Sequence, residues 1–239
     1  MAKAEGLLYE GKAKKVYATA KNDEFLVEYK DSLTAFNAQK KGSFAAKGSI
    51  NRDITSLLFR ELAKTGVPSH WVADTGDNQM LVKALEIIPL EVVVRNTLAG
   101  STAKKLGLEE GRKLPSPLVE FYFKKDELND PFVSDDQILL LGIAQASDLV
   151  ELKTQALRIN AGLQKIFAKI DLQLVDFKVE FGKTKQGQIL LGDEITPDCC
   201  RLWDMKTNEK MDKDRFRRDL GGIAEAYQEV LRRLRQHFQ

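Results

Sequence analysis

An alternating stretch near residue 175 constrains the fold more than any other part of this 239-residue sequence. Successive side chains of a β-strand point to opposite faces of its sheet, and between Leu174 and Gly182 every second side chain is apolar. One face then carries Val175, Phe177, Val179 and Phe181. The other face carries Asp176, Lys178 and Glu180. The simplest interpretation of such a charged row is a solvated outer face.

The next strand argues against a solvated face. Residues 189–195 begin as an apolar run, as in a strand buried on both faces, and turn acidic at Asp193. If residues 184–187 form a four-residue loop, Asp193 lies opposite Lys178, on the same face as Glu180. A register slip of one residue would turn Asp193 away. Two such carboxylates suit Mg²⁺, which binds through one or two carboxylates and substrate phosphates.

Two further segments have the features of anion-binding sites. A strand pattern ends in Arg95, and Gly100-Ser101 then opens a short helix with Ser101 as its N-cap. Helix N-termini favour anions, and an arginine can hold a phosphate through two hydrogen bonds. A surface ion pair is the competing interpretation of Arg95. The lysine-flanked hairpin at Gly11 could cover phosphates through its N–H groups, although most such hairpins are solvated turns.

The coarse pattern of elements favours an α+β fold. The first part of the chain is expected to form strands, followed by a helix at residues 50–62 and a further strand at Glu91 to Arg95, broken off by Pro89. The proline-punctuated segment 115–131 is interpreted mostly as loop, and residues 212–236 as a closing helix. Strands and helices do not alternate regularly, which disfavours a doubly wound sheet. We expect a β-rich N-terminal lobe at residues 1–84 and a larger α+β lobe at residues 85–239.

Composition excludes several classes of function. The formal net charge of +2 comes from 37 basic and 35 acidic residues, too even a balance to suggest nucleic-acid or membrane-surface binding. No apolar run approaches the roughly 20 residues that span a bilayer, and the first residues lack the apolar stretch of a secretory signal. The only cysteines are adjacent, and His70 and His237 are isolated. We therefore expect a cytoplasmic protein whose chemistry depends on carboxylates, lysines and arginines.

Five segments together resemble the phosphoribosylaminoimidazole-succinocarboxamide synthase (SAICAR synthase) family. They are GKAKKVY, IIPLEVVVRNTLAGS, LVDFKVEFG, LGDEITPDCCRLWD and MDKDRFRRDLGG, and they span almost the whole chain. The resemblance implies an ATP-dependent ligase of purine biosynthesis that joins an imidazole ribonucleotide carboxylate to L-aspartate, with Mg²⁺. It also implies a two-lobed α+β fold related to ATP-grasp and kinase-like lobes, with ATP in the cleft, and a homodimer.

The same resemblance implies roles for individual residues. Contacts to ATP are implied for Lys12, Ala13, Lys14, Val16 and Lys83. Coordination of Mg²⁺ against the polyphosphate is implied for Glu180 and Asp193. Binding of the ribonucleotide, chiefly its phosphate, is implied for Arg95, Ser101 and Arg201, and catalytic contact with the ribonucleotide and its reacting carboxylate for Asp176 and Lys178. The stretch around Asn37 and Lys40 departs from members with a Gly-Asp-Gly turn, so neither residue is assigned a role.

Three alternatives stay open at this point. A related ligase could use a different carboxylate and amine, which only a substrate screen would distinguish. A non-catalytic nucleotide-binding module would not require Arg95, Lys178, Glu180 and Asp193 together. Nucleic-acid binding would depend on Arg232, Arg233 and Arg235 of the closing helix, and a solvated face is the simpler interpretation of those arginines.

Overall fold

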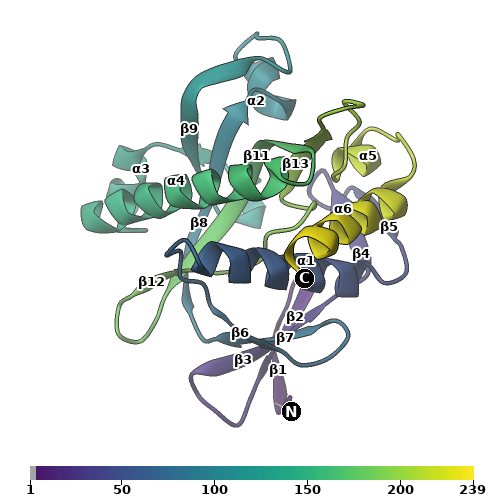
Figure 1. Cartoon of the computed structure of the whole chain (residues 1–239). Coiled ribbons are helices and arrows are strands. Elements are labelled where there is room, and N and C mark those ends of the chain that lie inside the picture. The colour runs from purple at the N-terminus through teal and green to yellow at the C-terminus, as the bar shows by residue number, and fades with distance from the viewer. Residues whose placement is uncertain (1–3) are drawn as a thin grey trace.

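A computed structural model describes residues 4–239, which form an α+β fold with two main sheets (Figure 1). The first sheet has the strand order β1-β2-β3-β7-β6. Its strands are β1 (Gly6–Glu10), β2 (Lys14–Ala18), β3 (Glu24–Tyr29), β6 (Trp71–Asp74) and β7 (Gln79–Lys83). A separate hairpin consists of β4 (Ser32–Ala35) and β5 (Lys40–Ser43). The predicted N-terminal strands are therefore confirmed.

The second sheet has the order β10-β9-β8-β11-β12, and β13 also pairs with β11. Its strands are β8 (Glu86–Thr97), β9 (Lys113–Phe123), β10 (Phe132–Val133), β11 (Leu172–Lys183), β12 (Ile189–Leu191) and β13 (Cys200–Asp204). The first sheet uses only strands that end by Lys83, and the second only strands that begin at Glu86 or later. The lobe boundary near residue 84 remains a prediction.

The described residues form six α-helices, and the two longest pack against the sheets. The six helices are α1 (Lys47–Ala63), α2 (Gly100–Lys105), α3 (Asp135–Leu140), α4 (Ala146–Ala168), α5 (Asp214–Arg217) and α6 (Ile223–Phe238), with a 3₁₀ turn η1 (Asp126–Leu128). In Figure 1, α4 lies across β8 and β11, and α1 lies beside α6, as the contacts between these elements also show. Phe177 and Val179 of β11 join the apolar core beneath these helices. The charged row of β11 therefore faces away from the core.

Proline positions caused two wrong predictions. β8 continues through Pro89, because its register against β11 shifts at that point and the missing N–H interrupts no ladder bond. β9 occupies the first half of the segment that was expected to be mostly loop: its register shifts between Leu118 and Lys113, so Pro115 and Pro117 lie in the irregular part. The closing helix is also shorter than predicted, because Gly221 and Gly222, both with positive φ, separate α5 from α6.

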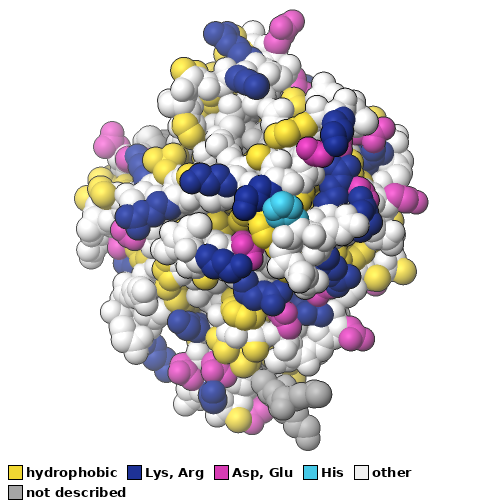
Figure 2. Space-filling view, viewed as in Figure 1, with side chains coloured by type: hydrophobic (Ala, Val, Ile, Leu, Met, Phe, Trp, Pro, Cys, Tyr) yellow, Lys and Arg dark blue, Asp and Glu magenta, His cyan; other side chains and the backbone are white. Residues whose placement is uncertain are grey.

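The arginines of α6 are held by carboxylates. Arg232 pairs with Glu229, Arg233 with Asp204 and Glu229, and Arg235 with Asp53. Figure 2 shows Lys and Arg side chains scattered over the face formed by α1, α4 and α6 rather than gathered in one stripe. This arrangement favours the interpretation of a solvated face over nucleic-acid binding. Among residues 4–239, no helix is both long and apolar enough to cross a membrane.

Candidate active site

The charged face of β11 opens onto a cavity of about 470 Å³, here called the central cavity. The antiparallel pairing of β11 with β8 places Asp176 beside Arg95 and Glu180 beside Glu91. The cavity is lined by the basic residues Lys12, Arg95, Lys178, Arg201, Lys213 and Arg217. It is also lined by the acidic residues Glu91, Asp176, Glu194 and Asp198. The charged row predicted from the alternation thus faces a cavity and not an open solvated surface.

Lys178 lies at the centre of an acidic group at one end of this cavity. Its Nζ is 2.7 Å from Glu180 Oε1, 3.0 Å from Asp193 Oδ2 and 3.8 Å from Glu91 Oε1. Burial alone would lower the pKa of Lys178, but Asp193, Glu180 and Glu91 together raise that pKa well above its ordinary value. Two of these carboxylates have a second ammonium partner, Lys14 for Asp193 and Lys124 for Glu180.

Asp193 reaches Lys178 by a different route from the predicted one. The observed pairs are Phe181 with Leu191 and Lys183 with Ile189, so the predicted register is wrong by one residue. In that register Asp193 would turn away, but β12 already ends at Leu191 and Asp193 adopts a left-handed φ of 55°. This local turn brings the carboxylate back to the face of Glu180. The predicted proximity is confirmed although the reason given for it was wrong.

Asp176 joins two arginines at the other end of the row. Its Oδ2 accepts hydrogen bonds from Arg95 Nη1 at 2.8 Å and Arg201 Nη1 at 2.9 Å. Arg95 also donates from Nε to Glu120 at 2.8 Å, and Arg201 donates from Nε to Asp214 at 3.1 Å. Charge-assisted bonds of this kind fix both guanidinium planes. The two arginines, with Asp176 between them, are called the arginine pair below.

A buried ion pair supports the loop that closes the cavity. Lys47 of α1 is only 1% exposed, and its Nζ lies 2.5 Å from Asp198 Oδ2. Asn51 donates to the same oxygen at 3.0 Å, and the hydroxyl of Tyr227 in α6 donates to Oδ1 at 2.8 Å. Despite burial, the charges of Lys213 and Lys47 and the hydrogen bonds from Lys47 and Tyr227 hold the pKa of Asp198 well below its usual range. The loop before β13 is therefore tied to two helices.

The sequence over residues 7–234 matches the family described as SAICAR synthetase. The chain belongs to the SAICAR synthetase family. The phosphoribosylaminoimidazole-succinocarboxamide synthase of Shouchella clausii is 54% identical over 234 residues, covering 98% of each chain. That of Desulfitobacterium hafniense is 55% identical over 230 residues, covering 96% of each.

Solved SAICAR synthetase structures confirm the predicted fold. The crystal structure of the Ehrlichia chaffeensis enzyme superposes with a TM-score of 0.94 at 42% identity, covering 96% of this chain and 98% of that one. A SAICAR synthetase in complex with ADP superposes with a TM-score of 0.92 at 45% identity, covering 95% and 96%. The α+β class and the SAICAR synthase-like architecture are therefore both correct.

Most residues singled out from the sequence lie at or beside the central cavity of this SAICAR synthetase chain. Lining the cavity are Lys12, Ala13, Arg95, Ser101, Asp176, Lys178 and Arg201. Lys14, Glu180 and Asp193 belong to the ion-pair group around Lys178. Val16 packs instead against the core of the first sheet, and the side chain of Lys83 is exposed at the end of β7. Ser101 lines the cavity but does not cap α2, because the N-cap is Ala99.

Several cavity residues were missed from the sequence. Glu91 and Arg95 share one face of β8, and the two-residue period could have identified Glu91. Glu194 is 6% exposed, and its Oε2 has no hydrogen-bond partner among the described residues. Burial raises the pKa of Glu194 against the opposing charge of Lys14. Arg217 comes from a charged segment whose pattern gave no indication of which side chains point inward.

Gly100 has a geometric role beside the arginine pair. Its φ is +61°, and a Cβ added there would lie 2.5 Å from Arg201 Nη2. We expect Gly100→Ala to destabilise the fold by about 1–2 kcal/mol from backbone conformation alone and to displace Arg201 in addition. Gly107→Ala is the matched control, because Gly107 has φ +64° with no atom within 4 Å of the added Cβ. Urea unfolding of both variants would separate the effect of the contact with Arg201 from that of the backbone conformation. Equal losses of unfolding free energy in the two variants would contradict a role for this contact.

Asp212 should make stability depend on pH in an unusual direction. Burial, with the nearby charge of Asp214, raises the pKa of Asp212 to about 7. The native state therefore binds this proton more tightly than the unfolded chain, whose aspartate titrates near 3.9. The stabilisation is complete below about pH 4 and is lost as pH rises to about 7, by about 1.4 kcal/mol per pH unit. The difference in unfolding free energy between wild type and Asp212→Asn, measured from pH 5 to 8, should fall accordingly; a constant difference would contradict the prediction.

Proposed function

We propose that this chain joins carboxyaminoimidazole ribonucleotide to L-aspartate through an amide bond, using ATP and Mg²⁺, and that the central cavity is its active site. ATP-dependent ligation of these substrates to SAICAR is the activity of the SAICAR synthetase family, to which the chain belongs. The main support from the structure is the position of Lys178 among three carboxylates, in the same cavity as the arginine pair.

ATP is proposed to lie between a lobe at residues 1–84 and a lobe at residues 85–239. The hairpin at Gly11 would cover its phosphates, with contacts from Lys12, Ala13 and Lys14, while Val16 would contact the nucleotide base or sugar. A role for Lys83 would require its exposed side chain to turn inward. The name of one solved neighbour, a SAICAR synthetase in complex with ADP, supports the use of this nucleotide.

Glu180 and Asp193 are proposed to hold Mg²⁺. Both carboxylates lie within 3.0 Å of one ammonium nitrogen, so they can share a single cation. Among residues 4–239, no set of three or more histidine, cysteine or acidic side chains has the geometry of a metal cage. Two protein carboxylates completed by phosphate oxygens and water are the usual environment of Mg²⁺. When bound, the ion would neutralise charge on the transferring phosphoryl group.

The ribonucleotide is proposed to bind beside the arginine pair. Arg95 and Arg201 carry the positive charge, Ser101 adds a hydroxyl at the opening of α2, and a phosphate would be held by all three. Asp176 keeps both guanidinium groups in place and faces the same cavity. The reacting carboxylate would then lie between Asp176 and Lys178.

The chemistry proceeds in two steps. The ribonucleotide carboxylate attacks the γ-phosphorus of ATP, which forms an acyl phosphate and releases ADP. The amine of aspartate then attacks the acyl carbon, phosphate leaves, and the amine loses a proton. Negative charge grows on phosphoryl oxygens in the first step, where the ammonium of Lys178 is positioned to stabilise it.

Omitting each component in turn tests this function. Purified protein with Mg²⁺, ATP, carboxyaminoimidazole ribonucleotide and L-aspartate should form the succinocarboxamide product and ADP, and no product without any one of the four. Product with another amine but not aspartate would identify a related ligase. ATP binding without turnover would identify a non-catalytic module.

A homodimer in the cytoplasm is proposed from the family resemblance, and sedimentation analysis would test the dimer.

A further inference from the structure

Among the described residues, two cations of the central cavity have no carboxylate that they do not share with other cations. Lys213 and Arg217 both line the cavity and lie four residues apart across α5, so their side chains project from the same side of one helical turn. The other cavity cations that face the acidic group or the arginine pair are matched by carboxylates, as described above. The end of the cavity at α5 therefore carries excess positive charge.

Lys213 is partly buried and has no close counterion among the described residues. Its side chain is 16% exposed, and its nearest carboxylate oxygen among the described residues, Asp198 Oδ1, is 3.8 Å from Nζ. That carboxylate is already occupied by Lys47, Asn51 and the Tyr227 hydroxyl. Burial lowers the pKa of Lys213 from its ordinary value. An anion that entered the cavity here would gain a desolvated ammonium partner.

Arg217 shares its only carboxylate among residues 4–239 with two other arginines. Asp214 Oδ1 is 2.7 Å from Arg217 Nη1, while Asp214 Oδ2 is 3.1 Å from Arg201 Nε and 3.5 Å from Arg218 Nη2. One negative charge thus serves three guanidinium groups. The side chain of Arg217 is also 30% exposed, so some of its N–H groups face the open space of the cavity.

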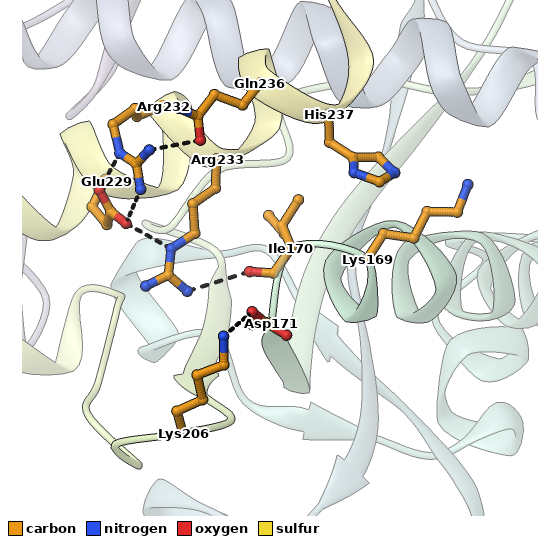
Figure 3. Close-up of a pocket in the computed structure, with 9 residues that line it drawn as sticks. All are labelled: Lys169, Ile170, Asp171, Lys206, Glu229, Arg232, Arg233, Gln236 and His237. Atoms are coloured by element: carbon orange, nitrogen blue, oxygen red, sulfur yellow. Dashed lines mark hydrogen bonds and ion pairs between the residues drawn. The ribbon is translucent and has the colours of Figure 1, made fainter.

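A second cavity, of about 340 Å³, contains arginines that are held closely by carboxylates (Figure 3). In Figure 3, Arg232 donates to Glu229 and Gln236, and Lys206 pairs with Asp171. Lys169 and His237 lie apart from these ion pairs and do not converge with them on one point. Because Arg232 is held by Glu229 and Gln236 outside the central cavity, it is a suitable control.

We propose that Lys213 and Arg217 bind the two carboxylates of L-aspartate and so select a dicarboxylic amino acid as the amine substrate. This inference depends on the proposed function. Two cations one helical turn apart suit two carboxylates separated by two carbon atoms. The arginine pair and Ser101 are reserved for the phosphate of the ribonucleotide, and the acidic group for the metal and ATP, which leaves α5 for the dicarboxylate. The amine of aspartate would then face the row of β11.

Steady-state kinetics of Lys213→Met and Arg217→Gln tests this assignment, with each substrate varied in turn. Loss of a charge-assisted hydrogen bond should raise KM for aspartate by about 10- to 100-fold. KM for the ribonucleotide and for ATP should stay within about threefold. The preference for aspartate over asparagine, measured as a ratio of kcat/KM values, should fall about tenfold in at least one variant, and Arg217→Lys should recover part of it. Arg232→Gln should change none of these values.

The outcomes separate this inference from the proposed function. If wild-type protein makes no amide from aspartate, both the proposed function and this inference are wrong. If wild type is active and both variants keep the wild-type KM for aspartate, only the inference is overturned. A rise confined to KM for the ribonucleotide also overturns it, since the pair would then bind phosphate. Should Lys213→Met fail to fold, the more exposed Arg217→Gln carries the same test.

Discussion

Lys178→Met is expected to lower kcat by about 10²–10³ while the protein stays folded. The ammonium of Lys178 is the only group within hydrogen-bond distance of both Glu180 and Asp193 among the described residues. Methionine preserves the length and apolar stem of the side chain and removes the charge. Without that charge, phosphoryl oxygens of the transferring group lose a preorganised partner at the moment their charge increases.

The fold should tolerate this substitution, because both carboxylates keep a second ammonium. Asp193 retains Lys14, and Glu180 retains Lys124. Product formation would be followed beside thermal unfolding and ATP binding. Lys183→Met is a matched control on the same strand, since Lys183 pairs with Asp148 outside the central cavity. Wild-type kcat in a folded Lys178→Met protein would mean that Lys178 only balances charge.

Asp198→Ala is expected to reduce the free energy of unfolding by about 3–5 kcal/mol. The substitution leaves the ammonium of Lys47 buried without a counterion, and it removes the acceptor of the Tyr227 hydroxyl. Breaking one side of a buried ion pair costs far more than the pair itself contributes, because the remaining charge has lost both water and partner.

A double substitution distinguishes this cause from a general loss of packing. In Lys47→Met with Asp198→Ala, the buried ammonium of Lys47 is gone as well, so the double variant should be more stable than Asp198→Ala alone. Urea unfolding monitored by circular dichroism gives each free energy. A loss below about 1 kcal/mol for Asp198→Ala, or an additive loss in the double variant, would contradict the explanation.

Features of the site that depend on neighbouring residues could be predicted from the sequence, whereas features that depend on distant segments could not. The charged row of β11 follows from a local period of two, and its predicted facing was correct. The pairing of β12 was wrong by one residue, because the length of a turn is weakly encoded and the left-handed backbone of Asp193 has no distinct local signature. Pro89 was misread because a proline is tolerated where the register of a strand shifts.

Contacts between distant segments were beyond prediction from local patterns. Lys47 and Asp198 are 151 residues apart, and each alone resembles an ordinary surface charge. Their meeting depends on how α1 and α6 pack over the sheets, which hydrophobic periodicity does not specify. The same limit applies to Lys213 and Arg217, which are recognisable as unmatched only when every carboxylate around them has been located.

The pairing of β11 has one more consequence. On one side, β8 accompanies it nearly end to end, whereas on the other side β13 pairs only as far as Phe177 and β12 begins at Phe181. Between them, a loop makes the contacts, with Lys178 N–H donating to Cys199 and Gly192 N–H donating to Glu180. The proposed active site thus lies at a gap in the sheet, where one wall is a regular ladder and the other is a loop anchored by Asp193 and Asp198. A displacement of residues 192–199 would therefore move Asp193 relative to Lys178, while the ladder between β11 and β8 stays unchanged.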